Sequence, residues 1–177
     1  MSKKLIQAFG NWVDGDRFWD REIDIELLTQ KINEGAHILL VAQRRMGKTS
    51  IMKELKRRLD HRYTCVFVDL QKASSAEDAI VEISLALGPH KSLWDKTKGL
   101  FSNILNKFTE NIEEISLGEV GIKLRAGLTA GNWSEKGDSL FSILAGSEKP
   151  VLLLIDEVPL LVNRILKGED FKITRER

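Results

Sequence analysis

Between residues 37 and 59 the spacing of the apolar residues changes, and this change limits the possible folds of the chain more than any other feature of the sequence. An apolar run over 37–41 has the length of a buried strand, and it gives way to a polar loop that carries Gly47, Lys48 and Thr49. A segment whose apolar residues recur at helical spacing follows at once, over 51–59. Strand, loop and helix in this order are the setting that a phosphate-binding loop requires.

The residue types in this loop suit a nucleotide triphosphate. A tight loop that opens a helix aims several backbone N–H groups at one point, where they bind phosphate oxygens. Gly47 permits close approach of the backbone, Lys48 is long enough to reach the β- and γ-phosphates, and the Thr49 hydroxyl suits Mg²⁺. We therefore predict ATP and Mg²⁺ as cofactors. The predicted nucleotide-binding residues of the loop are Arg44, Arg45, Met46, Gly47, Lys48, Thr49 and Ser50; for Arg44 and Arg45 a solvated or salt-bridged role stays open.

A second apolar run, over 151–155, lacks alternation and predicts a parallel strand that is covered on both faces. It ends in Asp156 and Glu157, which match the second half of an ATP site. We predict that Thr49 and Asp156 hold the metal, with Asp156 acting through water, and that Glu157 orients or deprotonates the attacking water. Lys48 and Glu157 are the predicted catalytic residues. The alternative is an acidic pair that only caps the strand end.

On these motifs the chain resembles the P-loop ATPases of the AAA+ and STAND type, in particular the archaeal-ATPase-like group. In that group a loop of the form Gly-Pro-Arg-Arg-x-Gly-Lys-Thr-Ser follows a helix start with Arg-Glu; residues 42–50 and 20–22 match these. The likeness covers 18–165 except 88–136. It implies a three-layer α/β/α core with a parallel sheet, and an adenine pocket walled by Phe18 and Trp19, for which plain core packing is the alternative.

Two departures from the group matter. Ala42 stands where the group has its first glycine and Gln43 where it has proline; alanine would cost about 1 kcal/mol if position 42 needs a positive φ. The group also continues past the position of Arg177 with a sensor strand, a further strand and a helical lid. We therefore expect an N-terminal portion of an ATPase domain, with a sheet that is incomplete at the C-terminus. The alternatives are that the two motif strands close up or that a partner supplies the missing strand.

The whole chain, 1–177, is expected to form one P-loop core, because 177 residues with 42% hydrophobic content can bury one core. The remaining sequence patterns predict the units of this core. The N-terminal half is predicted to contain a loop and helix over 9–34 with Asp20 as N-cap and Gly35 as C′, the loop unit 37–60, a strand at 65–69, and a helix from a capping box at Ser74 and Glu77 to Leu87. An insertion of about 92–128 follows, with a helix to Phe108 and a β-hairpin that turns at Gly118-Glu119. The last predicted units are a helix that ends near Gly146 with Leu140, Phe141 and Leu144 on one face, the strand 151–157, a short helix over 159–166, a turn at 168–170, and Thr174 as the cap of a further helix.

The charge balance limits the partners. Lys plus Arg (27) nearly cancels Asp plus Glu (26), so the net charge of +1 provides no field over the whole molecule that would attract nucleic acid or anionic membrane. Local basic residues leave DNA open as a partner, either through 53–62 or through Lys123 and Arg125, although a solvated face is the simpler interpretation. Self-association or a protein partner also stays open, and no membrane association is expected.

Cys65, the single cysteine, lies in an apolar run and predicts a small core residue in a reducing compartment. Because no apolar run approaches the roughly 20 residues that span a bilayer, we expect a cytoplasmic protein. The favoured function is an ATP-binding and ATP-hydrolysing module that acts as a nucleotide-dependent switch. The alternatives are a nucleotide-binding fragment without catalysis, and a DNA-associated ATPase of the origin-recognition or loader kind.

Overall fold

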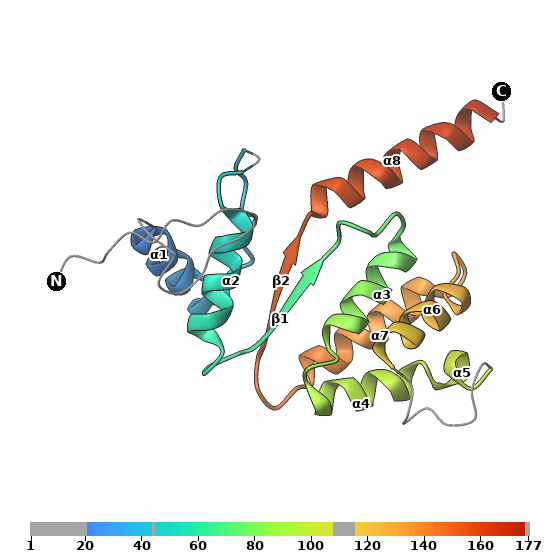
Figure 1. The fold of residues 1–177 in the computed structure, drawn as a ribbon, viewed down its shortest axis with the longest axis horizontal. Coiled ribbons are helices and arrows are strands. Elements are labelled where there is room, and N and C mark those ends of the chain that lie inside the picture. Colours follow the sequence, from blue (N-terminus) through green and yellow to red (C-terminus); the bar gives the residue numbers. More distant parts are fainter. Residues whose placement is uncertain (1–20, 44, 108–115, 176–177) are drawn as a thin grey trace.

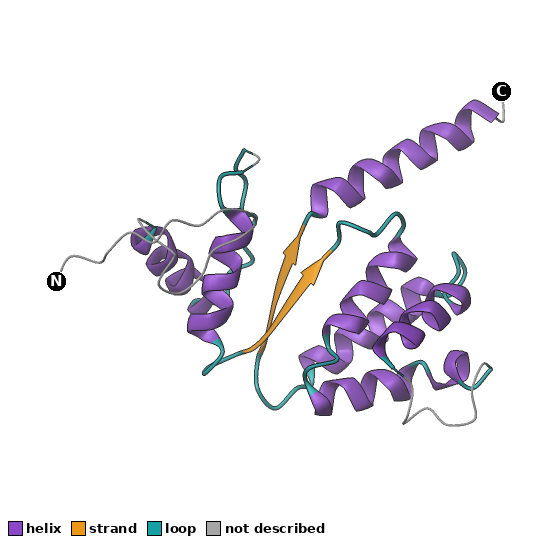
Figure 2. Ribbon diagram, in the orientation of Figure 1, coloured by secondary structure: helices purple, strands orange, loops and turns teal. Residues whose placement is uncertain are grey.

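The computed structural model describes residues 21–43, 45–107 and 116–175, with side chains as far as residue 168. Within these residues it has eight helices and a two-stranded parallel sheet, which confirms a mixed α/β fold (Figures 1 and 2). The elements are α1 (Glu22–Asn33), α2 (Lys48–Leu59), β1 (Thr64–Asp69), α3 (Ala76–Ala86), α4 (Lys91–Leu100), α5 (Ser102–Leu105), α6 (Leu117–Gly127), α7 (Trp133–Ala145), β2 (Val151–Asp156) and α8 (Val158–Arg175).

The sheet pairs the two apolar runs that precede Asp69 and Asp156. β1 and β2 run parallel, in a register that sets Thr64 opposite Val151 and Asp69 opposite Asp156. A parallel pair requires a crossover connection, which here is the helical segment from α3 to α7. Because the register is unbroken, the carboxyl ends of both strands lie at the same edge of the sheet.

Helices cover both faces of this sheet (Figure 1). On one face, α1 and α2 build a small core with Ile25, Leu55 and Cys65. On the other face, the helices from α3 to α7 and the start of α8 build the larger core, to which Val66 and Val68 belong. Successive side chains of a strand point to opposite faces, so β1 serves both cores. This arrangement places α2 against the sheet, with its first residues near the carboxyl ends of the strands.

The expected strand over 37–41 is wrong. From residue 36 to residue 43 the backbone forms neither helix nor strand. Leu39 and Val41 are each 80% exposed, whereas Leu40 packs against the smaller core. A strand needs a neighbour for its hydrogen-bond ladder, and in the described part of the chain β2 pairs only with β1. The run has the composition of a strand but no neighbour, and the two motif runs do not close up on each other.

The expected β-hairpin is also wrong, since residues 117–127 form α6 and Ile115 lies outside the described residues. The reason is a capping box: the Ser116 hydroxyl accepts from the Glu119 N–H at 3.3 Å, and the Glu119 carboxylate accepts from the Ser116 N–H at 3.1 Å. Hydrogen bonds from the Ser116 hydroxyl and N–H also lower the pKa of Glu119. Val120 and Leu124, four residues apart, are buried together on one helical face.

Two other helix boundaries and the buried face of one helix differ from those expected. The N-cap of α3 is Ser75, whose hydroxyl accepts from the Asp78 N–H at 3.2 Å, one residue later than the expected box. The helix expected over 92–108 divides into α4 and α5 at Phe101, and Phe108 lies outside the described residues. On α7, Leu140 is buried but Phe141 is 45% exposed, so the expected apolar face is only partly correct.

Glycines explain where α1 ends and why α8 does not end early. Gly35 has φ +78°, and the N–H groups of Gly35 and Ala36 donate to the carbonyls of Ile32 and Lys31, which confirms Gly35 as the residue that stops α1. Gly168 has no positive φ, so α8 passes through the expected turn at 168–170 and through the expected cap at residue 174. The expected N-cap Asp20 lies outside the described residues; Arg21 has that place.

The base of α8 is fixed to the loop that follows β1. The Arg164 guanidinium donates to the carbonyls of Gln71 and Ala73, at 2.7 Å each. Beyond this contact α8 leads away from the sheet (Figure 1). None of the helices in the described ranges has the length and apolar character needed to cross a membrane.

Candidate functional site

The loop before α2 is shaped by left-handed backbone at two positions. Arg45 has φ 67°, and Gly47, the N-cap of α2, has φ 78°. Glycine adopts this conformation without steric cost, whereas Arg45 bears some strain. Ala42 is not among the positive-φ residues, so the cost considered for alanine at that position does not arise.

The first turn of α2 is suited to bind an anion. The first N–H groups of a helix have no partner within it, and Gly47 has no side chain to cap them. The first turn contains no acidic residue and begins with Lys48, whose charge opposes the positive end of the helix dipole. An anion at this point would satisfy the N–H groups and compensate the lysine charge, which favours phosphate binding here.

The Lys48 side chain folds back over its own loop. Its ammonium donates to the carbonyls of Ala42 at 2.8 Å and Gln43 at 3.1 Å. The Met46 N–H donates to the Gln43 carbonyl at 3.3 Å and closes the turn. The two loop carbonyls therefore serve as the acceptors of the ammonium group and hold it beside the start of α2.

The two halves of the candidate site meet at Thr49 and Asp156. The Thr49 hydroxyl donates to Asp156 Oδ2 at 2.5 Å, although the residues are 107 positions apart in the chain. The other carboxylate oxygen, Oδ1, accepts from the Glu157 N–H at 3.0 Å. Asp156 is 9% exposed, and its carbonyl accepts from the Leu70 N–H at 3.1 Å. The fold thus brings the loop residue and the strand-end carboxylate together, as the motif spacing predicts.

Glu157 lies at a strained point of the backbone. Its φ of 60° is in the left-handed region, which costs a residue other than glycine about 1–2 kcal/mol. Its carbonyl accepts from the N–H groups of Leu160 and Leu161 at the start of α8, while its side chain is exposed. Strained positions of this kind cluster at functional sites. Asp69, at the neighbouring strand end, instead accepts from the Gln71 N–H at 2.9 Å and shapes a turn.

The other predicted site residues are placed as follows. Arg45 and Met46 are exposed in the loop, and Ser50 is buried at 7% exposure in the first turn of α2. Arg44, Phe18 and Trp19 lie outside the described residues. The structure therefore brings together the loop, Thr49, Asp156 and Glu157, and the expected adenine wall stays a prediction.

The donor set at Thr49 and Asp156 fits Mg²⁺. Both residues offer hard oxygen atoms, and Mg²⁺ is held by one or two carboxylates together with waters and phosphate oxygens rather than by a cage of protein ligands. No group of three or more His, Cys, Asp or Glu that would suit a metal occurs in the described ranges.

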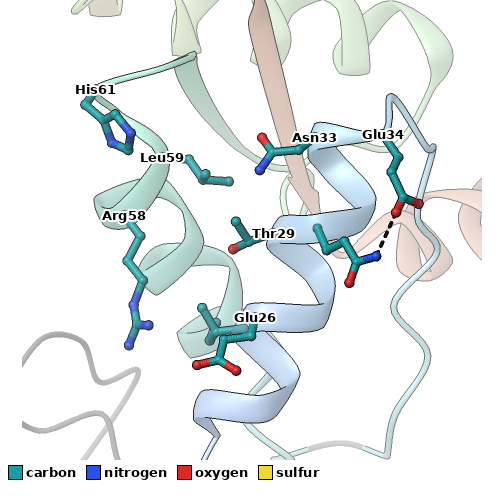
Figure 3. Close-up of a pocket in the computed structure, with 9 residues that line it drawn as sticks. Glu26, Thr29, Asn33, Glu34, Arg58, Leu59 and His61 are labelled. Atoms are coloured by element: carbon teal, nitrogen blue, oxygen red, sulfur yellow. Dashed lines mark hydrogen bonds between the residues drawn. The ribbon is translucent and has the colours of Figure 1, made fainter.

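An open groove of about 560 Å³ lies elsewhere, between α1 and the end of α2 (Figure 3). Its lining residues are Ile25, Glu26, Thr29, Gln30, Asn33, Glu34, Arg58, Leu59 and His61. At the rim of the groove, hydrogen bonds from Lys31, the larger effect, and from Gln30 lower the pKa of Glu34. None of the loop residues, Thr49 or Asp156 lines this groove, so we place the candidate site at the loop.

Three basic residues of α2, Lys53, Arg57 and Arg58, have partners within the fold. Glu54 is buried at 1% exposure and accepts from the guanidinium groups of Arg57 at 2.7 and 3.0 Å and of Arg58 at 2.6 Å. Lys53 lies over the Phe67 ring, 4.3 Å from its centroid. On α6, the Arg125 guanidinium pairs with Glu82 and lies 3.7 Å from Asp78. These contacts reduce the positive charge that the two surfaces left open for DNA would offer.

Sequence patterns missed two residues near the loop. Glu54 stands among lysines and arginines, a pattern typical of a solvated helix face, and Arg21 stands at the start of the first predicted helix, where its residue type predicts no contact with the loop. The Arg21 guanidinium donates to the Met46 carbonyl at 3.3 Å, a contact between residues 25 positions apart that no local pattern predicts. Comparisons with protein-family models, curated proteins and solved structures gave no match to this chain.

Proposed function

We propose that this chain is an ATP-binding and ATP-hydrolysing P-loop module that acts as a nucleotide-dependent switch. The observation that carries the proposal is the 2.5 Å contact between the Thr49 hydroxyl and Asp156. A loop that opens a helix and a strand-end carboxylate are each common alone. Their meeting across 107 residues supports one composite site for phosphate and metal.

In this proposal, the N–H groups at the start of α2 and the Lys48 ammonium bind the β- and γ-phosphates. Thr49 and Asp156 hold Mg²⁺, which neutralises charge on the phosphate oxygens when bound. Glu157, exposed beside Asp156, orients or deprotonates the attacking water. The strained backbone at Glu157 links the site directly to α8, which is therefore the element that a change of nucleotide would act on.

The test is ATP binding by the wild-type chain, Lys48→Ala and the matched control Lys56→Ala, measured by calorimetry with Mg²⁺. Lys56 lies two turns further along α2 and is not part of the loop. Losing a charge-assisted contact of about 2 kcal/mol or more should weaken binding by Lys48→Ala roughly 30-fold. Lys56→Ala should bind as wild type. Equal affinity of the wild type and Lys48→Ala would refute the proposal, whereas binding without turnover would support the nucleotide-binding alternative.

A further inference from the structure

Arg21, the residue before α1, contacts the backbone of the candidate phosphate loop. Its Nη2 donates to the Met46 carbonyl at 3.3 Å, and its Nη1 pairs with Asp24 at 3.2 Å. The arginine side chain is 38% exposed. Because Asp24 belongs to the first turn of α1, the acid holds the guanidinium where it reaches the loop.

This contact differs from the others that shape the loop. The Lys48 ammonium holds the carbonyls of Ala42 and Gln43, yet the same ammonium is the proposed phosphate ligand. If phosphate draws the ammonium away, these bonds weaken. The Arg21 contact uses neither the ammonium nor a helix N–H group, so it persists when phosphate binds.

The geometry of the peptide bond gives this contact a consequence. A trans peptide is planar, and its C=O and N–H point in opposite directions. The Met46 carbonyl and the Gly47 N–H belong to one peptide, so a cation that holds the carbonyl on the α1 side directs the N–H to the other side. Gly47, at φ 78°, has no side chain that would fix this plane.

We infer that Arg21 is a positioning residue of the phosphate loop, which sets the orientation of the Met46–Gly47 peptide and so of the Gly47 N–H. As far as it concerns nucleotide, the inference rests on the proposed function. Under this inference, the start of α1 acts together with the loop that precedes α2. Arg21 acts through Met46 and does not itself bind phosphate.

A neighbouring contact provides the control. Glu22 accepts from Arg58 at 2.6 Å, and this ion pair also links α1 to α2 but lies on the helix body rather than on the loop. Glu22→Gln therefore weakens the docking of α1 without touching Met46. Arg21→Gln removes the charged donor, and Arg21→Lys keeps a charge but places its donors on one nitrogen in place of the planar fork.

The experiment measures hydrogen exchange of the amides of residues 45–50 without nucleotide, and then ADP affinity, in the 177-residue chain. Losing one hydrogen bond of ordinary strength should speed loop exchange in Arg21→Gln about fivefold and weaken ADP binding about fivefold. Arg21→Lys should be intermediate on both measures. Glu22→Gln should match the wild type on both.

Unchanged loop exchange in Arg21→Gln would overturn the inference, as would equal acceleration in Arg21→Gln and Glu22→Gln, which would indicate general loosening of α1. Faster loop exchange with unchanged ADP affinity would overturn the nucleotide part. If loop exchange is faster only in Arg21→Gln and the wild type binds no ADP, the result would support the positioning role and refute the proposed function.

Discussion

Two glycine substitutions on α6 should change stability in opposite directions. A Cβ added at Gly127 would lie 2.2 Å from Cγ2 of Ile104 and 3.1 Å from its Cγ1, where carbon atoms need about 3.5 Å. Ile104 is 6% exposed and cannot move into solvent. Overpacking costs about 1–3 kcal/mol, and the gain from removing glycine offsets roughly 0.5–1 kcal/mol of it. Gly127→Ala should therefore lower the free energy of unfolding by about 1–2 kcal/mol.

Gly118, in the first turn of the same helix, has no atom within 4 Å of an added Cβ and no positive φ. Gly118→Ala should raise the free energy of unfolding by about 0.5–1 kcal/mol, since alanine favours helix. Urea denaturation followed by circular dichroism measures both variants. In a hairpin, Gly118 would begin the turn with a positive φ, and alanine would destabilise it. A loss of stability in Gly118→Ala, or equal gains in both variants, would refute the account of α6.

Two further predictions concern a buried thiol and a strained acid. Burial raises the pKa of the Cys65 thiol to about 11 from an ordinary value near 9. Because the thiol of the unfolded chain ionises first, the free energy of unfolding should fall between about pH 9 and 11. Urea titrations measure this free energy against pH, and the same slope in the wild type and in Cys65→Ala would contradict the prediction. Glu157→Gly should relieve the left-handed backbone strain and be more stable than Glu157→Gln by about 0.5 kcal/mol. Both variants should lose ATP turnover in a phosphate-release assay. Turnover in either variant would exclude Glu157 as the base.

The strand before Asp156 and the end of α1 at Gly35 were the most predictable parts of the fold. The unbroken run before Asp156 forms β2 as expected, and the stop of α1 at Gly35 follows from glycine's access to positive φ. The run over 37–41 shows the limit of such patterns. Its composition favours a strand, but a ladder depends on a neighbour that composition does not contain.

The error at α6 arose from two signals that compete over the same residues. Alternation at Val120, Ile122 and Leu124 favours a strand, while Ser116 and Glu119 at capping-box spacing favour a helix start. Burial decides between them, because Val120 and Leu124 are inside and Ile122 is 70% exposed. In the candidate site, residue types and spacing indicated Thr49 and Asp156, whereas the contact of Arg21 with Met46 depends on how the start of α1 lies against the loop, which sequence spacing does not contain.

We propose that Thr49 and Asp156 form one metal-dependent nucleotide site. The affinity for ATP with and without Mg²⁺, measured in the wild type and in Asp156→Asn, tests this proposal. We expect Mg²⁺ to tighten ATP binding by the wild type about tenfold or more, the effect of one charge-assisted contact, and to have little effect on Asp156→Asn. Equal dependence on Mg²⁺ in the two proteins would contradict the claim.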